Sequence, residues 1–246
     1  MSVRARMLPA ALVAGLLGLG ALAGCATGGP AGPVDVSPSR PGASTPAEVE
    51  VSAAWLDGGD MIGVLLRGSS TCPPLAEQVE VEDGVVQVSL VDRDGACTRD
   101  AVLRGIAVPT PEGVDTAADV PIEIRGDSYT GRTTLAAAPG LTPAGGLEAA
   151  QPSAGWAGAD TIALLTWGSS SCPPAIADAA VSAPGEIAVT LATPPADQIC
   201  TADMAPRVTV VPIGGAEPGT AYDLVLTGGA ASAAPAPTRI AVAGTP

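Results

Sequence analysis

A fifteen-residue segment occurs twice in this 246-residue chain, and this duplication constrains the fold more than any other feature. Residues 60–74 (DMIGVLLRGSSTCPP) align with residues 160–174 (DTIALLTWGSSSCPP) without a gap, and nine of the fifteen pairs are identical. Trp55 precedes the first segment and Trp156 precedes the second, and each Trp is expected to anchor a core. Self-similarity at a constant offset marks an internal repeat. The chain therefore contains two copies of one small domain.

Each copy has the sequence pattern of short β-strands. The apolar, branched runs 62–66 and 162–165 both end close to a glycine, and alternating segments flank an Asp-Gly pair in one copy and a Pro-Gly pair in the other. Further strands are expected at 79–81, 85–90, 102–108, 121–125 and 133–137, and at 180–181, 187–191, 208–211, 223–226 and 239–242. No segment sustains a helical period. The pattern predicts an all-β protein with two tandem small β-sandwich domains, Ig-like or barrel-like.

The amino terminus has the form of an export signal. Arg4 and Arg6 precede an apolar run rich in Ala, Leu and Gly, which ends in LAGC at Cys25. An uncleaved membrane helix is the alternative, but ~17 glycine-rich residues are marginal for a hydrocarbon core about 30 Å thick. The LAGC segment resembles the lipobox of bacterial lipoproteins. That resemblance implies cleavage after residue 24 and attachment of a diacylglycerol to the Cys25 thiol.

Composition divides the rest of the chain into folded and linking parts. Residues 25–48 are rich in Gly, Pro, Ser and Thr, so we expect the lipidated cysteine to be followed by a flexible, disordered tether. Residues 139–154 have a similar composition and are expected to link the copies. The predicted organisation is a signal peptide at 1–24, the first β-domain at 49–138 and the second at 155–246.

The five cysteines suit an oxidising compartment. Assigning Cys25 to lipid leaves an even set of four. Of the three possible connectivities we favour Cys72–Cys97 with Cys172–Cys200, because each pair then lies inside one copy. A Cys₄ metal site is the alternative, but zinc sites of that kind usually carry closely spaced cysteine pairs, which are absent here. We therefore expect one disulfide per copy and no metal.

Missing residue types exclude several kinds of chemistry. The chain has no His, Lys, Asn or Phe, so Ser-His and Cys-His pairs, Schiff bases and histidine metal sites are excluded. The formal charge is −14, and removal of Arg4 and Arg6 with the signal would make it −16. Such a chain repels nucleic acid and anionic headgroups, so nucleic acid is not expected as a partner and membrane attachment would depend on the lipid. No cofactor is expected.

The repeated loops are the candidate binding elements. Arg67 and Trp167 hold the same place beside them, and both residue types are enriched at binding hot spots. The alternative is structural: a strand end that turns sharply and is pinned by its disulfide, with position 67 facing solvent and position 167 packing on the linker. The candidate loop residues are Gly68, Ser69, Ser70 and Thr71 in the first copy and Gly168, Ser169, Ser170 and Ser171 in the second.

Acidic residues offer the remaining route to catalysis. A serine nucleophile would need a carboxylate as its base, and the pairs Asp57/Asp60 and Asp92/Asp94 suit glycosidase carboxylates or calcium ligands in residue type. Residues 92–95 lack the full ligand run of a calcium-binding loop, so solvated turns explain these acids better. We therefore expect that the protein is not an enzyme.

The motifs together resemble a family. The lipobox at Cys25, the Pro/Ser/Thr-rich tether, the GSS[ST]CPP loops and the later CTxD segments (97–100 and 200–203) are similar to two-repeat lipoproteins of high-GC Gram-positive (actinobacterial) bacteria. The resemblance implies export and lipid anchoring on the outer face of the cytoplasmic membrane, and it implies no activity. We expect a non-catalytic module that binds an envelope protein or a wall component. The alternatives are an extracellular protease inhibitor using the stapled loops and a carboxylate-type enzyme acting on glycans.

Overall fold

The computed structural model describes residues 46–93, 95–144, 151–229 and 237–246, and it is all-β, with 53% strand and 2% helix. A 3₁₀ turn, η1 (Asp57–Gly59), follows the second strand. The first half contains β1 (Ala47–Glu48), β2 (Val51–Leu56), β3 (Met61–Gly68), β4 (Leu75–Glu82), β5 (Val85–Val91), β6 (Val102–Pro109), β7 (Val120–Arg125) and β8 (Tyr129–Leu135). The second half contains β9 (Ser153–Gly158), β10 (Thr161–Gly168), β11 (Ile176–Ala183), β12 (Glu186–Leu191), β13 (Ala205–Pro212), β14 (Asp223–Gly228) and β15 (Thr238–Ala243).

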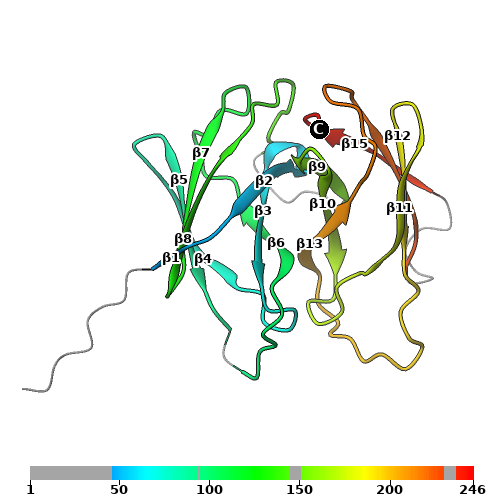
Figure 1. Cartoon of the computed structure of the whole chain (residues 1–246), viewed down its shortest axis with the longest axis horizontal. Helices are drawn as coiled ribbons and strands as arrows, with labels where there is room; N and C mark the ends of the chain where they lie inside the picture. Colours follow the sequence, from blue (N-terminus) through cyan, green and yellow to red (C-terminus); the bar gives the residue numbers. More distant parts are fainter. Residues whose placement is uncertain (1–45, 94, 145–150, 230–236) are drawn as a thin grey trace, which may run out of the picture. The chain divides into compact units, whose positions relative to one another are not determined.

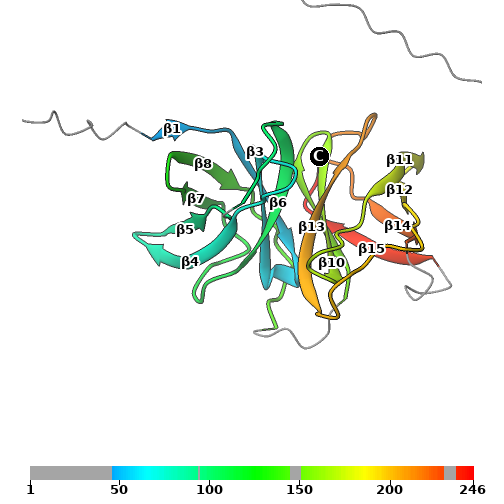
Figure 2. The ribbon, with the colours of Figure 1, turned by 90° about the horizontal axis from the view of Figure 1, so that it is seen from below.

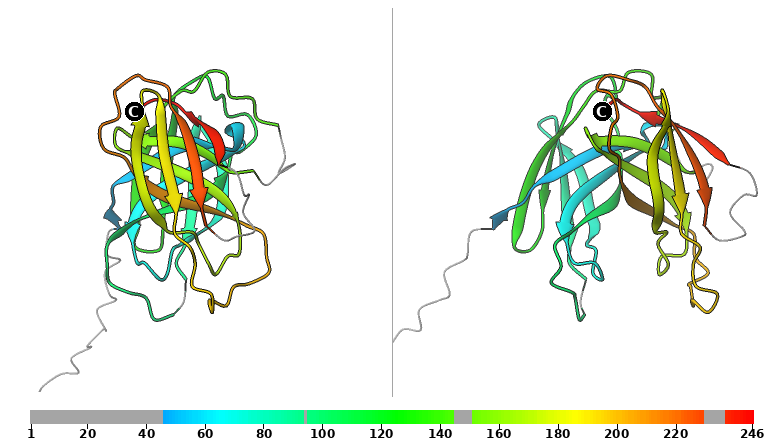
Figure 3. Two further views of the ribbon diagram at one scale, coloured as in Figure 1. Left: turned by 90° about the vertical axis from the view of Figure 1, so that its right-hand side faces the viewer. Right: turned by 45° about the vertical axis from the view of Figure 1, so that its right-hand side comes forward.

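The strands form three sheets (Figure 1). The first copy has a three-stranded sheet, β2-β3-β6, and a five-stranded sheet, β1-β8-β7-β5-β4. The second copy repeats these pairings as β9-β10-β13 and β15-β14-β12-β11, which the left view of Figure 3 shows from the β11 side. Here the two groups join into one seven-stranded sheet, because β15 also pairs with β9 in parallel.

Three apolar cores stack along the compact unit Ser44–Pro246. One core lies between the two sheets of the first copy, and a second lies between the corresponding strand groups of the second copy. The third core lies between the copies, with Leu56 and Leu65 from one and Ala163 and Leu165 from the other. Figure 2 shows β6 and β13 beside one another at this junction. The all-β prediction is confirmed, but the sheets form a continuous stack and do not divide clearly into two separate sandwiches.

The central strands explain the uninterrupted apolar runs of the repeat. In β10, Ile162 and Leu164 enter the core of the second copy, whereas Ala163 and Leu165 enter the core between the copies. Six successive residues of β3 are likewise buried. A strand covered on both faces needs apolar residues at consecutive positions, where a strand with one wet face would alternate.

The copies meet through equivalent positions. Gly105 of β6 aligns with Val208 of β13 in the strand registers, and a Cβ on Gly105 would lie 2.3 Å from a methyl carbon of Val208. A Cβ on Gly155 would lie 2.2 Å from the carbonyl oxygen of Trp55. Glycine at these two positions therefore permits the close approach of the two sheets.

Two disulfides, Cys72–Cys97 and Cys172–Cys200, each join residues of one copy, which is the pairing favoured from the sequence. Residues 1–24, Cys25 and almost all of the expected tether lie outside the described residues. In the part of the chain that is described, no helix has the length and apolarity needed to cross a bilayer.

Candidate functional site

The serine-rich loop of the first copy binds the CTRD segment that follows the hairpin. The hydroxyls of Ser69 and Thr98 lie 2.9 Å apart, and the Ser70 backbone N–H donates to Thr98 Oγ1 at 3.1 Å. The same N–H also donates to Asp100 Oδ1 at 2.9 Å, and the Thr98 hydroxyl donates to that carboxylate as well. The two motifs of the repeat are therefore partners of one another beside the disulfide.

The second copy reproduces this arrangement. Ser169 Oγ lies 2.8 Å from Thr201 Oγ1, and the Ser170 N–H donates to Asp203 Oδ1 at 3.0 Å. The Thr201 N–H donates to Ser171 Oγ at 3.0 Å, and the Thr201 hydroxyl donates to Asp203. The serine hydroxyls contact groups of their own copy, which supports the structural interpretation of the loops. These contacts give no support to a protease-inhibiting loop, whose serines would have to contact the protease.

These contacts make the two aspartates stronger acids. Hydrogen bonds from Thr98, and then from Ser70, hold the pKa of Asp100 well below its ordinary value of 3.8, and Thr201 and Ser170 do the same for Asp203. A lowered folded-state pKa contributes stability that is complete above the unfolded pKa and is lost as the pH falls toward the folded pKa.

We therefore expect the variant carrying Asp100→Asn and Asp203→Asn to be less stable than the wild type above about pH 5. Below about pH 4 the difference in stability should narrow, because the carboxylates of the unfolded wild-type chain take up protons there while those of the folded chain stay ionised. Denaturant unfolding at a series of pH values measures this. A control with Asp178→Asn and Asp197→Asn, at exposed positions, removes the same charge. An equal narrowing in the control would contradict the assignment.

Arg67 and Trp167 have different surroundings despite their equivalent positions. Arg67 is exposed, and its Nη1 donates to the carbonyl of Ala101 at 3.2 Å. Trp167 is half-buried against the core between the copies, and its Nε1 donates to the carbonyl of Gln151 at 3.1 Å. Packing of the indole on the segment before β9 accounts for Trp at this position.

A pocket of about 820 Å³ lies at the end of the second copy where β10, β12 and β14 finish. We call it the mouth pocket; its lining includes Thr166, Trp167, Leu191, Arg207 and Leu226, together with several prolines. Two of the candidate loop residues, Gly168 and Ser169, also line it, as does Cys172 of the disulfide. The structure thus places one of the two candidate loops at a cavity.

Thr166 and Arg207 have the buried polar side-chain atoms of this pocket that lack a partner among the described residues. Thr166 of β10 and Arg207 of β13 are directly paired in the antiparallel register of these two strands. Thr166 is 8% exposed, and among the described residues its hydroxyl has no hydrogen-bond partner. Arg207 Nη1 donates to the carbonyls of Ser169 and Cys172 at 2.9 and 2.7 Å, whereas its buried Nε has no partner in the described parts of the chain. Burial lowers the pKa of Arg207, and the nearby Asp203 opposes this effect.

Sequence reasoning missed both residues, although the repeat carried a signal for one of them. Thr166 aligns with Leu66, which lies in the core of the first copy at 3% exposure. A threonine where the sister copy has a buried leucine puts a hydroxyl at a core position. Such a hydroxyl costs about 1–3 kcal/mol when it is left unpaired.

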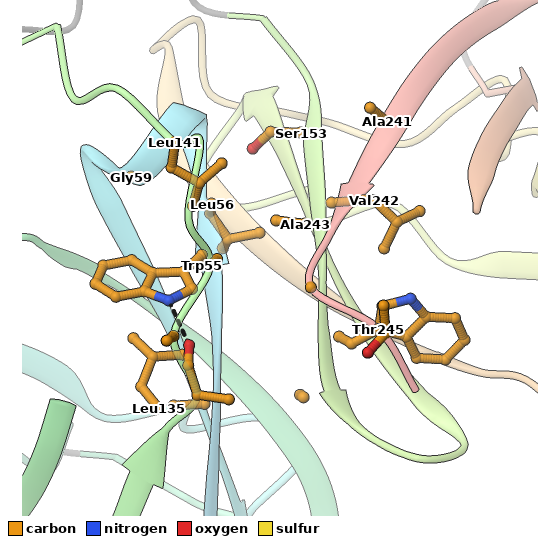
Figure 4. Close-up of a pocket in the computed structure, with 18 of the residues that line it drawn as sticks. Trp55, Leu56, Gly59, Leu135, Leu141, Ser153, Ala241, Val242, Ala243 and Thr245 are labelled. Carbon is orange, nitrogen blue, oxygen red and sulfur yellow. Dashed lines mark hydrogen bonds between the residues drawn. The ribbon is translucent and has the colours of Figure 1, made fainter. Parts of the chain in front are cut away.

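A second cavity, of about 900 Å³, lies at the junction of the copies (Figure 4). Its lining includes Trp55, whose Nε1 donates to the carbonyl of Ala136 at 2.8 Å, and Trp156, whose Nε1 has no partner among the described residues. Trp55 and Trp156 are 3% and 7% exposed, as expected of core anchors. This neutral donor is the only buried polar side-chain atom of the lining that lacks a partner within the described residues.

Of the acidic residues paired in the sequence, Asp57 is the one that lines either of the two cavities among the described residues. Asp57 has its pKa raised by burial and, secondarily, by Asp60. Among the described residues that line the junction cavity, Asp57 has the only side-chain carboxylate, whereas glycosidic cleavage of the usual kind needs two. Asp92 accepts from the Tyr129 hydroxyl at 3.5 Å, and Asp94 lies outside the described residues. No cluster of three acidic or cysteine residues suited to a metal occurs in the described ranges.

Comparison of the chain with family models, with curated proteins and with solved structures gives no match.

Proposed function

We propose that the protein is a lipid-anchored, non-catalytic binding module of the cell envelope, and that the mouth pocket of its second copy is the binding site. The observation that carries the proposal is that Thr166 and Arg207 both line a cavity and each has a buried polar atom without a partner among the described residues. Buried polar groups in folded proteins normally have hydrogen-bond partners, so two neighbouring residues whose buried polar atoms lack partners in a pocket mark a place for a ligand.

The remaining elements of the proposal come from the sequence. Cleavage after residue 24 and lipidation of Cys25 would tether the chain on the outer face of the cytoplasmic membrane, and residues 49–138 and 155–246 would each be a small sandwich-like module. Mass spectrometry of the mature amino terminus tests the anchor. An unmodified Cys25 thiol in the native protein would remove the envelope location from the proposal.

The Thr166→Val variant should be more stable than the wild type by about 1 kcal/mol, because it removes an unpaired buried hydroxyl and keeps the side-chain shape. Denaturant unfolding without ligand measures this. Thr161→Val, at the other end of β10, is the control. The Thr161 hydroxyl donates to Asp160 at 3.0 Å, so its removal should not stabilise the protein. Destabilisation by Thr166→Val would show that the hydroxyl is paired in solution.

Binding itself is tested with the low-molecular-mass fraction of envelope extracts added to the purified full chain in detergent micelles. We expect the fraction to raise the melting temperature of the wild type and of Thr161→Val, because a ligand that binds the folded state stabilises it. The shift should be smaller for Thr166→Val. The same shift in all three proteins, or none in any, would contradict the mouth pocket as the binding site.

A further inference from the structure

We infer that the mouth pocket takes a small molecule carrying a carboxylate, which the Nε–Nη2 edge of Arg207 binds with the help of the Thr166 hydroxyl. This inference rests on the proposed function and names the ligand class of the same site. It is argued from the hydrogen bonds of the guanidinium, the placement of Thr166, the walls of the pocket and the charge of the chain.

The guanidinium of Arg207 is held in place by one of its nitrogens. Nη1 donates to the carbonyls of Ser169 and Cys172, and the Cys172–Cys200 disulfide lies in the same loop. The Nε–Nη2 edge remains, and Nε is buried without a partner among the described residues. This edge has two parallel N–H donors, whose spacing matches the two oxygens of a carboxylate. No ion pair within 4.0 Å joins Arg207 to an acid in the described ranges.

Thr166 supplies a second donor close to the first. Directly paired residues of an antiparallel ladder lie on the same face with Cβ atoms about 4.5–5.5 Å apart. One ligand oxygen can therefore reach both side chains. Thr227 also lines the pocket, but its hydroxyl lies 3.1 Å from that of Thr190 and already has a partner.

The remaining walls suit an apolar body. Leu191 and Leu226 line the cavity together with prolines and Trp167, and its volume of about 820 Å³ lies within the range of small-molecule sites. A ligand with one anionic end and a compact apolar end fits this division of polar and apolar surface.

Charge limits the size of the ligand. The chain has a formal charge of −14, and Asp203 lies near Arg207, so a long polyanion would be repelled over most of its length. A monocarboxylate places its single charge at the one guanidinium and avoids this repulsion. Its affinity should be modest, because the nearby Asp203 offsets part of the attraction.

Ligand-observed NMR titrations of the full chain in detergent micelles test the inference with butyrate, benzoate and N-acetylproline, each against its neutral amide. At least one acid should bind saturably and about tenfold or more tightly than its amide, since charge-assisted hydrogen bonds are roughly twice as strong as neutral ones. Thr166→Val and Arg207→Lys should each weaken that acid about five- to tenfold, because each removes a directed donor. Arg239→Lys, on an exposed arginine of β15, should leave it unchanged.

The outcomes separate the inference from the proposed function. If acid and amide bind equally and Thr166→Val abolishes both, the inference that the pocket recognises a carboxylate is overturned, and the pocket remains a binding site. Acid binding that is insensitive to Thr166→Val and Arg207→Lys would place the ligand elsewhere and overturn the inference. No binding of any probe, combined with a Thr166-dependent shift by envelope extracts, would also overturn the carboxylate while the proposed function stands.

Discussion

Gly155→Ala is expected to destabilise the protein by about 3 kcal/mol or more, because the new methyl group would overlap the backbone of the other copy. A Cβ at this position would lie 2.2 Å from the carbonyl oxygen of Trp55 and 3.3 Å from the Cβ of Ala54. A carbonyl oxygen belongs to the main chain, so no rotamer change relieves the contact and strand β2 must move away from β9. Denaturant unfolding of the wild type and the variant measures the loss.

Gly158→Ala is the matched control, since it lies in the same strand and its Cβ would meet nothing within 4 Å. The control should change the free energy of unfolding by less than about 1 kcal/mol, the ordinary scale of a Gly-to-Ala exchange. Similar values for the two variants would show that the copies do not pack together in solution as they do here. A large difference would confirm the contact between β2 and β9.

This contact between β2 and β9 determines whether the two copies unfold separately or together. Two copies joined by a flexible linker would fold and unfold separately, whereas two copies sharing a core of Leu56, Leu65 and Leu165 are expected to lose stability together. The interface uses the equivalent positions 105 and 208, with glycine on one side and valine on the other. A difference of this kind between the copies lets equivalent faces fit without a void or an overlap.

Much of the strand arrangement could be predicted from the repeat. The expected strands 62–66, 162–165 and 223–226 lie inside β3, β10 and β14, and the Asp-Gly and Pro-Gly turns connect β4 with β5 and β11 with β12. The core between the copies was not predicted, although the unbroken apolar runs carried its signal. A continuous apolar run predicts a strand covered on both faces, but it does not say which element covers the second face, so only the packing of the two copies identifies it.

The site was predicted only in part. Residues of the GSSSCPP loop line the mouth pocket, and its serines also form hydrogen bonds with the CTAD segment, which the sequence did not predict. Two motifs separated by about thirty residues cannot be recognised as mutual hydrogen-bond partners from spacing, because the disulfide loop that joins them has no regular period. Arg207 lies outside every motif, and only the strand register places it opposite Thr166.

Removal of the Cys172–Cys200 disulfide by the paired change Cys172→Ala and Cys200→Ala is expected to cost about 3.5 kcal/mol of stability. The bond closes a loop with a sequence separation of 28, and a cross-link of that span restricts the unfolded chain by about this amount. The carbonyl of Cys172 also accepts from Arg207 Nη1, so loss of the bond should loosen the guanidinium as well. Stability is measured by denaturant unfolding, and binding by the carboxylate titration.

The other disulfide provides the control, because Cys72–Cys97 spans 25 residues and closes the equivalent loop of the first copy. Cys72→Ala with Cys97→Ala should cost a similar free energy of unfolding and leave carboxylate binding intact below the unfolding transition. The two double variants thus separate stability from site geometry. Equal loss of binding in both would mean that the mouth pocket depends on the stability of the whole stack, and Arg207 would then have no special dependence on its own loop.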